Sequence, residues 1–425
     1  MLPFTFVHAA DLHLDSPFTG LQSVDPDVAH VLREATFTAF ARVVDLCVAR
    51  GADFLLVAGD VFDGEDRSLR AQVRFRAELA RLADAGITAH VVHGNHDPRD
   101  TWVAALRWPD AVHFFGAGTV EQVECRRGGE RLAVLHGTSF ARREVWDNLS
   151  LRYRRQGHDG FCIGLLHANV GGAAGHAPYA PCSLEDLRAS GMDYWALGHV
   201  HRPGVLRPAE PAVVYPGNPQ GRHPGEDGRR GCAVVSVDEH GAVTVELVPT
   251  DQVRWVRGSV AIDGLRTEDE LLARAAERCL ELQEAEDGLP VVCRLELTGR
   301  GPLHGRLRQR SMDDVAGAVR ESLTGAEAFV HLDRVSDATR PDVDAAERLR
   351  GQDFVGDLLR LAEEYRRNPE QLAALAQCLD ELFEHRAARR YLSGPSGAPL
   401  LGPAELLALL DEAQARCLDE MVDEP

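Results

Sequence analysis

The chain has 425 residues, of which 44% are apolar and 26% are charged, and its formal net charge is −20. This composition predicts a folded, soluble protein of two or three domains and excludes a disordered chain. Every one of the 46 basic residues is arginine. No Gly-rich loop ending in Gly-Lys-Ser or Gly-Lys-Thr can therefore exist, which excludes a standard P-loop ATPase.

The expected elements fall into three parts along the chain. In residues 1–250, short apolar runs alternate with helical patterns at 26–50 and 68–85, which predicts an α/β domain. Residues 255–335 are expected to form a small α+β domain. Its predicted strands are Gly258–Ile262, Val291–Leu297 and Ala328–Leu332, and its predicted helices are Thr267–Glu284 and Met312–Leu323. Residues 341–425 are helical and acidic in pattern, with an interruption at Ser393–Pro399.

The N-terminal residues and the cysteine content bear on the cellular location expected for the protein. The run Leu2–Val7 is short and has no basic flank, so a signal peptide is not expected. No stretch approaches the roughly 18 apolar residues of a membrane span. The 9 cysteines are odd in number and include no closely spaced pair, which favours reduced thiols. We therefore expect a cytoplasmic protein that does not associate with a membrane.

Five strand-like apolar runs are each followed at once by residues able to bind a metal ion. The runs are Phe4–Val7, Phe54–Ala58, His90–Val92, Ile163–Leu166 and Tyr194–Leu197. They lead to Asp-x-His at 11–13, Gly-Asp-x-x-Asp at 59–63, Gly-Asn-His-Asp at 94–97, a single histidine at 167 and Gly-His-x-His at 198–201. In open α/β sheets, sites form beyond the carboxyl ends of strands, so we expect these residues to meet.

The side chains expected to meet offer oxygen and imidazole nitrogen but no sulfur. They are Asp11, His13, Asp60, Asn95, His167, His199 and His201. Such a set suits Mn²⁺, Fe or Zn²⁺ better than Ca²⁺ or Mg²⁺ alone. Seven ligands suffice for two ions that share a bridging carboxylate. Two ions ~3.5–4 Å apart can activate water and steady both oxygens of an in-line displacement at phosphorus, which predicts a phosphoesterase.

Each motif alone has an ordinary structural explanation. Asp-x-His occurs by chance in many chains of this length, and Gly-Asp commonly marks a turn after a strand. A lone histidine such as His167 is more often a core or surface residue than a metal ligand. Gly-Asn-His-Asp and Gly-His-x-His are rarer. The prediction of a metal site therefore depends on the ordered set of motifs.

In this order the motifs resemble those of the calcineurin-like metallophosphoesterase superfamily, over roughly residues 1–250. Within it, the chain resembles the SbcD-type DNA repair nucleases. The opening Asp11–Phe18, followed by Gly20 and Leu21, is similar to a YhaO-like subgroup. The resemblance implies an α/β sandwich of two central sheets flanked by helices, followed by a small α+β cap domain and a C-terminal helical tail.

The resemblance also implies roles for individual residues. One metal ion is implied at Asp11, His13 and His201, a second at Asn95, His167 and His199, and a bridge at Asp60. His96 is implied to stay free of metal and to donate a proton to the leaving oxygen or steady charge on phosphorus. Asp97 is a candidate to hold the His96 ring, with a local turn cap as the alternative. Asp63 is expected to lie outside the ligand set.

The resemblance to SbcD-type nucleases implies an Mn²⁺-dependent DNA exonuclease and single-strand endonuclease that acts in DNA repair. It implies a homodimer and a coiled-coil, SMC-like ATPase partner that docks on residues 341–425. The net charge counts against DNA, because neutralising phosphates supplies much of the affinity of nucleic-acid proteins. Arginines at 142–143, 152–155, 222 and 229–230 are either a DNA-facing rim or an ordinary solvated surface.

Three other functions fit parts of the pattern. A small-molecule or nucleotide metallophosphodiesterase would keep all seven ligands. Protein phosphatases of the superfamily usually carry Gly-Asp-x-x-Asp-Arg-Gly and Gly-Asn-His-Glu, whereas Gly64 and Asp97 stand at the differing positions here. An inactive scaffold is disfavoured because the whole set is present. The residues alone lead to phosphoester hydrolysis, while DNA as the substrate depends on the resemblance.

Overall fold

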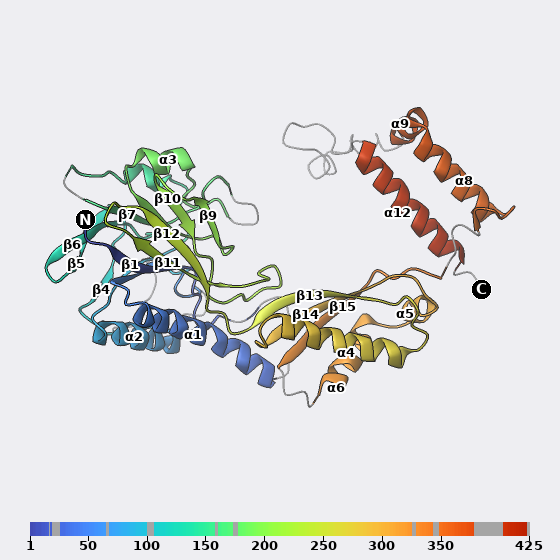
Figure 1. Ribbon diagram of the computed structural model, residues 1–425, viewed down its shortest axis with the longest axis horizontal. Coiled ribbons are helices and arrows are strands. Elements are labelled where there is room, and N and C mark those ends of the chain that lie inside the picture. The colour runs from blue at the N-terminus through green and yellow to red at the C-terminus, as the bar shows by residue number, and fades with distance from the viewer. Residues whose placement is uncertain are drawn as a thin grey trace. The chain divides into compact units, whose positions relative to one another are not determined.

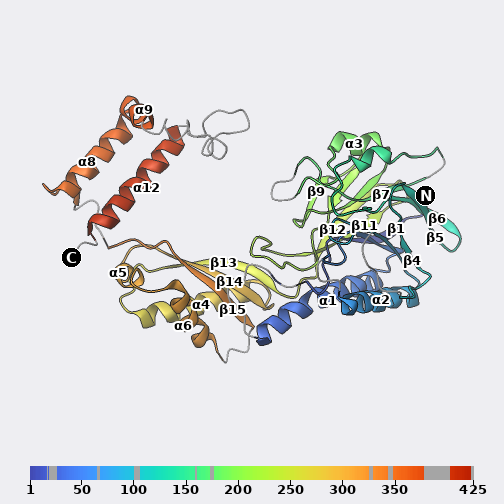
Figure 2. The same ribbon diagram turned by 180° about the vertical axis from the view of Figure 1, so that it is seen from behind.

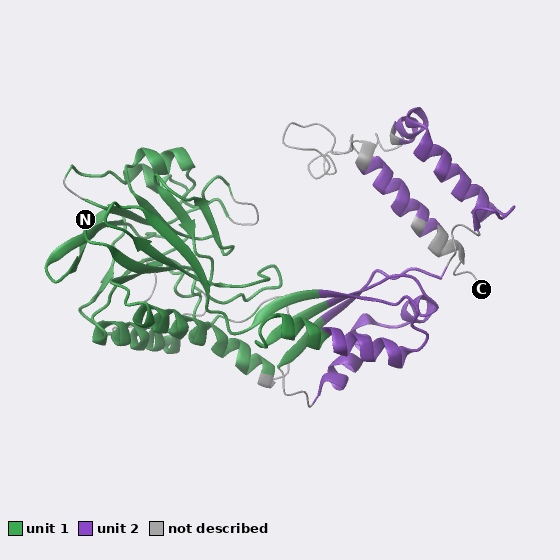
Figure 3. Ribbon diagram, in the orientation of Figure 1, with its two compact units in different colours: residues 1–257, 279–294, 325–333 green, residues 258–278, 295–324, 334–425 purple. Residues whose placement is uncertain are grey.

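The computed structural model describes residues 1–16, 18, 26–64, 68–99, 106–157, 160–172, 177–324, 329–342, 348–377 and 403–422 (Figure 1). Pro17, Gly20 and Leu21 of the opening motif, Ala328 of a predicted strand and the interruption at Ser393–Pro399 lie outside these residues. Two compact units make up the chain (Figure 3): residues 1–257, 279–294 and 325–333, and residues 258–278, 295–324 and 334–425. The domain boundaries expected from the sequence stay predictions.

The first unit contains two 6-stranded mixed sheets. The first sheet has the order β12 (Val243–Pro249), β11 (Gly231–Val237), β1 (Phe4–Ala9), β2 (Phe54–Ala58), β3 (Thr88–Val92) and β4 (Val112–Phe114). The second has the order β5 (Glu121–Arg127), β6 (Glu130–Gly137), β7 (Cys162–His167), β8 (Tyr194–Gly198), β10 (Ala212–Tyr215) and β9 (Gly204–Arg207). From β1 to β4 and from β6 through β7 and β8 to β10, neighbouring strands are parallel.

The central strands of both sheets, among them β2, β7 and β8, are buried on both faces. Along β1, Phe4 and Phe6 lie in the core between the two sheets, whereas Val7 and Ala9 lie in a second core beneath the helices. This alternation follows from the two-residue period of a strand. On the far face of the second sheet, Trp195 lies in a third core. The expected α/β sandwich of two sheets flanked by helices is confirmed.

Helices cover the two outer faces of the sandwich. They are α1 (Pro26–Ala49), α2 (Leu69–Asp84), the 3₁₀ helix η1 (Leu149–Arg152) and α3 (Leu184–Ala189). Figures 1 and 2 show α1 and α2 along the first sheet and α3 on the opposite side, beyond the second sheet. Helix α2 begins after Ser68, whose side chain accepts a hydrogen bond from the Ala71 N–H, as an N-cap residue does.

A 3-stranded sheet follows, with the order β13 (Arg254–Ala261), β14 (Val291–Thr298) and β15 (Val330–Asp337). The helices of this region are α4 (Glu268–Ala285), α5 (His304–Leu307) and α6 (Met312–Leu323). Further along the chain come α8 (Phe354–Arg367), α9 (Pro369–Gln377) and α12 (Pro403–Val422). The expected α+β region and C-terminal helical region are therefore both present.

Two observations bear on membranes and disulfides. Among the described residues, no helix is both long enough and apolar enough to cross a bilayer. The described cysteines are free thiols, and all of them except Cys417 are buried.

Candidate metal centre

The residues predicted to bind metal come from two sheets and meet at one edge of the sandwich. Strands β1, β2 and β3 of the first sheet are parallel to one another, and so are β7 and β8 of the second sheet. The segments that leave their carboxyl ends carry the predicted ligands, which places them at a common edge. Asp11, Asp60 and His167 are all buried there.

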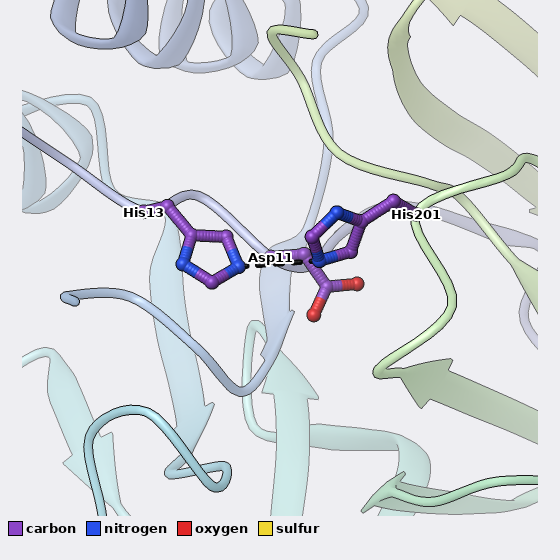
Figure 4. A group of neighbouring side chains, drawn as sticks. All are labelled: Asp11, His13 and His201. Atoms are coloured by element: carbon purple, nitrogen blue, oxygen red, sulfur yellow. Dashed lines mark hydrogen bonds between the residues drawn. The ribbon is translucent and has the colours of Figure 1, made fainter. Parts of the chain in front are cut away.

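Asp11, His13 and His201 form the first cluster, and their donor atoms lie within 4.8 Å of one another. The rings of His13 and His201 point toward each other (Figure 4), with 3.2 Å between their Nε2 atoms. The other ring nitrogen of His201, Nδ1, lies 2.5 Å from Glu226 Oε1, which fixes the ring and leaves Nε2 for the centre. A carboxylate and two converging imidazole nitrogens suit a divalent cation.

A second cluster lies beside the first and shares Asp11. Donor atoms of Asp11, Asp60 and His167 lie within 4.8 Å of one another. His167 Nε2 is 3.4 Å from Asp60 Oδ2 and 3.0 Å from Asn95 Oδ1. His199 Nδ1 lies 3.1 Å from the same Asn95 oxygen. The structure thus brings all seven predicted ligand residues together.

Backbone carbonyls orient the histidines of the second cluster. His167 Nδ1 lies 2.9 Å from the Ala58 carbonyl oxygen, and His199 Nε2 lies 2.7 Å from that of Ala177. A ring nitrogen that donates to a carbonyl holds the proton and leaves the other nitrogen's lone pair available. The available nitrogens are therefore those nearest Asn95. The donor set, oxygen and nitrogen without sulfur, fits two divalent ions.

The backbone at the centre is unusual. Four of the predicted ligand residues have positive φ angles: Asp11 (52°), His13 (42°), Asp60 (51°) and His199 (98°). Non-glycine residues rarely adopt this conformation, which is found preferentially at functional sites. Gly94 is required for close packing, because a Cβ there would collide with Asp60 Oδ1 and lie 2.8 Å from His167 Cε1. The glycine of Gly-Asn-His-Asp thus lets two ligand-bearing segments approach.

His96 is held by Asp63 rather than by Asp97, unlike the arrangement expected from the sequence. His96 Nδ1 lies 2.6 Å from Asp63 Oδ1, and its backbone N–H donates to Asp60 Oδ1 at 2.8 Å. Asp97 instead accepts hydrogen bonds from the backbone N–H groups of Val61 (2.9 Å) and Gly94 (2.8 Å). These hydrogen bonds connect the loops that follow β2 and β3.

Burial and charge pairing shift the pKa values of the centre. Burial, the largest influence, raises the pKa of Asp11 to about 6. Burial also raises the pKa of Asp60, but the charge of His167 and a hydrogen bond to it outweigh burial, so this pKa lies well below its usual range. Burial lowers the pKa of His167, yet Asp60 outweighs it and brings the value to about 9. Without metal, His167 is therefore protonated at neutral pH.

Comparison with known proteins identifies the family. Residues 4–203 match the model of the calcineurin-like phosphoesterases, and residues 255–340 match the middle domain of metallophosphoesterase YhaO. The chain is 37% identical over 336 residues to the uncharacterized metallophosphoesterase YhaO of Bacillus subtilis, an alignment that covers 79% of this chain and 82% of the relative. The chain belongs to the YhaO family of calcineurin-like metallophosphoesterases.

Two further relatives of this YhaO-family chain are more distant. It is 28% identical over 250 residues to the SbcD subunit of the SbcCD nuclease of Bacillus subtilis, covering 50% of this chain and 61% of the relative. It is 30% identical over 226 residues to the DNA double-strand break repair protein Mre11 of Aeropyrum pernix, covering 50% of this chain and 52% of the relative. The similarity to SbcD-type proteins is thus weaker than that to YhaO.

The predicted residues omit several that shape the centre of this metallophosphoesterase. Glu226 stands 25 positions after His201, and the carbonyl of Ala177 stands 22 positions before His199. Neither follows a strand-like run or belongs to a recognisable motif. Asp63 is visible in the sequence only as part of Gly-Asp-x-x-Asp, whose spacing does not show that it reaches His96.

The pKa of His167 predicts proton release on metal binding. Because the pKa is raised to about 9, a metal ion at Nε2 must displace a proton at pH 7, and metal affinity should rise with pH until about 9. Calorimetric titration with Mn²⁺ in two buffers of different ionisation enthalpy measures the released proton. His167→Gln should abolish the release, and His240→Gln, at a side chain that is 81% exposed, should not. Equal affinity at pH 6.5 and pH 8.5 would contradict the assignment.

Proposed function

We propose that this metallophosphoesterase is a two-metal DNA nuclease, an exonuclease that also cuts single strands. The observation that carries phosphodiester hydrolysis is the pair of donor clusters that share Asp11 at the meeting edge of the two sheets. DNA as the substrate is supported by the names of the more distant relatives, one a component of a nuclease and the other a double-strand break repair protein.

The residues of the centre divide into two ligand sets. The proposed first set is Asp11, His13 and His201, the second is Asn95, His167 and His199, and Asp60 joins the two. Two divalent ions, for which we propose Mn²⁺, would supply Lewis acidity and lower the pKa of water. The fixed ring nitrogens of His167, His199 and His201 keep the ligands in place before the substrate arrives.

His96 is the proposed proton donor to the leaving sugar oxygen. Its side chain is 33% exposed, so it can reach the substrate, and its Nδ1 is held by Asp63. Burial lowers the pKa of His96, but the hydrogen bond to Asp63 and the charge of Asp60 outweigh burial and raise it. The protonated form is thereby favoured, as a general acid requires.

Asp63→Asn should lower kcat about 10- to 100-fold, the cost of losing a partner that orients an active-site histidine. Because the raised pKa of His96 depends on Asp63, the basic limb of the pH–rate profile should move to lower pH. Asp45→Asn, at a side chain that is 59% exposed, is the matched control and should change neither. An unshifted profile in Asp63→Asn would contradict this positioning role.

An aromatic pair beside the centre, in which Trp146 is exposed and Tyr179 is partly buried, supports nucleic acid as the substrate. The side chain of Trp146 is 54% exposed, and its ring centre lies 5.0 Å from that of Tyr179. The Tyr179 ring centre in turn lies 6.1 Å from that of His199. Exposed aromatic rings bind single-stranded nucleic acids by stacking on bases. The pair is therefore the proposed platform for a base near the scissile phosphate.

Trp146→Ala should weaken binding of single-stranded DNA by about 1–3 kcal/mol, the contribution of one stacked base. Hydrolysis of a small chromogenic phosphodiester should be unchanged, because that ester has no base to stack. Leu151→Ala, at a residue that is 52% exposed, is the control for loss of an exposed apolar side chain. Fluorescence anisotropy of labelled oligonucleotides measures binding, and equal affinity for Trp146→Ala and Leu151→Ala would remove this support for DNA.

The alternative function is a small-molecule or nucleotide phosphodiesterase, which the net charge of −20 favours. The test is Mn²⁺-dependent cleavage of labelled single- and double-stranded DNA beside a chromogenic phosphodiester. Cleavage of DNA that weakens steeply with salt supports the nuclease. Turnover of the small ester with intact DNA favours the alternative.

The proposed nuclease acts in the cytoplasm as a homodimer with a coiled-coil, SMC-like ATPase. Docking is proposed on the C-terminal helices, where Phe354 of α8 is 72% exposed and Leu361 is 48% exposed. The SbcCD relative is by its name one component of a larger nuclease, which supports an assembly. Light scattering tests the dimer. Affinity capture with the wild type and with Phe354→Asp tests whether a coiled-coil, SMC-like ATPase binds and whether its binding requires α8.

A further inference from the structure

Arg222 is a largely buried cation beside the metal centre that belongs to none of the predicted ligand motifs. Its side chain is only 12% exposed. Nη1 donates to Asp63 Oδ2 at 3.3 Å, and Nε is buried without a hydrogen-bond partner. Among the described residues, Asp63 is the one acceptor found for this guanidinium, and that carboxylate also bonds to Ser16 and His96.

The backbone places Arg222 at the centre firmly. Its N–H donates to Glu226 Oε2 at 2.7 Å, while the other oxygen of Glu226 lies 2.5 Å from His201 Nδ1. One carboxylate therefore ties both Arg222 and a proposed metal ligand in place. The guanidinium is close enough to His13 that, after burial, its charge is the largest influence lowering the pKa of that histidine.

A guanidinium carries five N–H donors, and buried donors without partners are costly. A buried charge also requires a counter-charge. Asp63 and Glu226 supply the counter-charge, but one 3.3 Å hydrogen bond to a shared carboxylate satisfies few of the donors. Arginine matches tetrahedral oxyanions especially well, because its planar fork can donate two parallel hydrogen bonds.

We propose that Arg222 binds a non-bridging oxygen of the substrate phosphoryl group and steadies the charge that develops there. The contact involves hydrogen bonds and charge only, with no covalent step. This proposal rests on the proposed phosphoesterase activity but does not require DNA as the substrate, so it applies equally to a small phosphodiester. The rival explanation is that Arg222 only positions Asp63, and through it His96.

The test compares Arg222→Gln and Arg222→Lys with the wild type, using a chromogenic phosphodiester as substrate and inorganic phosphate as probe. Arg222→Gln should lower kcat about 10²- to 10³-fold, the usual cost of removing one donor to a developing oxyanion. Arg222→Lys, which keeps the charge without the fork, should restore part of this loss. Arg188→Gln, at an arginine of α3 that is 60% exposed, is the matched control.

Phosphate binding separates the two explanations without depending on turnover. Calorimetric titration of the metal-loaded proteins with inorganic phosphate should show weaker binding for Arg222→Gln, whereas Asp63→Asn, which removes a negative charge beside Arg222, should not weaken it. Unchanged phosphate affinity in Arg222→Gln, with metal content and melting temperature retained, would overturn the proposal. The proposal is also overturned if adding Arg222→Gln to Asp63→Asn lowers kcat no further, because Arg222 would then act only through Asp63. If DNA stays intact while the ester is hydrolysed, the nuclease proposal fails and this one is unaffected.

Discussion

His96→Ala should lower kcat on DNA and on small phosphodiesters roughly 10²- to 10⁴-fold, the usual contribution of a general acid. The two proposed metal ions should remain bound, because the imidazole of His96 belongs to neither proposed ligand set. Its backbone N–H, which donates to Asp60 Oδ1 at 2.8 Å, survives the substitution. Single-turnover kinetics and metal analysis of the same preparation measure both effects.

The leaving group provides the control for His96→Ala. An ester whose leaving group has a low pKa needs little protonation, so the loss of rate should shrink as that pKa falls. An equal loss on all esters would contradict proton donation and indicate charge stabilisation at phosphorus instead. Loss of metal from the variant would place His96 among the ligands.

The sequence predicts elements well where the hydrophobic pattern is regular. Helix α6 has the predicted bounds, Met312–Leu323, and its buried face repeats at helical spacing. The expected strand Ala328–Leu332 was too short, since β15 runs from Val330 to Asp337. A buried Asp333 continues this strand because its carboxylate pairs with Arg294 of β14 at 2.7 Å. A hydrophobic pattern does not show that a charged residue is paired with a neighbouring strand, so it places the end of such a strand too early.

The position of the metal centre was predictable for a simple geometric reason. Parallel strands end at a common edge, so residues that follow β1, β2 and β3 meet whatever lies between them in sequence. The contacts that orient these residues follow no such rule. The choice of Asp63 over Asp97 as the partner of His96 depends on loop conformations stabilised by buried hydrogen bonds. The positive φ angles of Asp11 and Asp60 likewise leave no signal in the sequence.

Asp60→Asn should remove most of the bound metal and lower kcat by more than about 100-fold. This loss exceeds the usual effect of removing a residue that only orients a metal ligand. Asp60 is the carboxylate proposed to join both ions, and an amide supplies neither its charge nor its second anionic oxygen. Metal analysis after gel filtration, beside turnover of a phosphodiester, measures both. Asp63→Asn is the matched control, because it removes a nearby carboxylate and should leave both ions bound.

The metal-free form of Asp60→Asn tests the same residue without turnover. In the wild type, the folded-state pKa of His167 is about 9, above its ordinary value of 6.5, because Asp60 lies 3.4 Å from its Nε2. This pair stabilises the metal-free fold fully below pH 6.5, and its contribution is lost as pH rises through about 9. The melting temperature of the metal-free wild type should therefore fall over that interval, and that of Asp60→Asn should fall less. Parallel pH curves would show that Asp60 does not hold the His167 proton, and proton release on metal binding would then need another source.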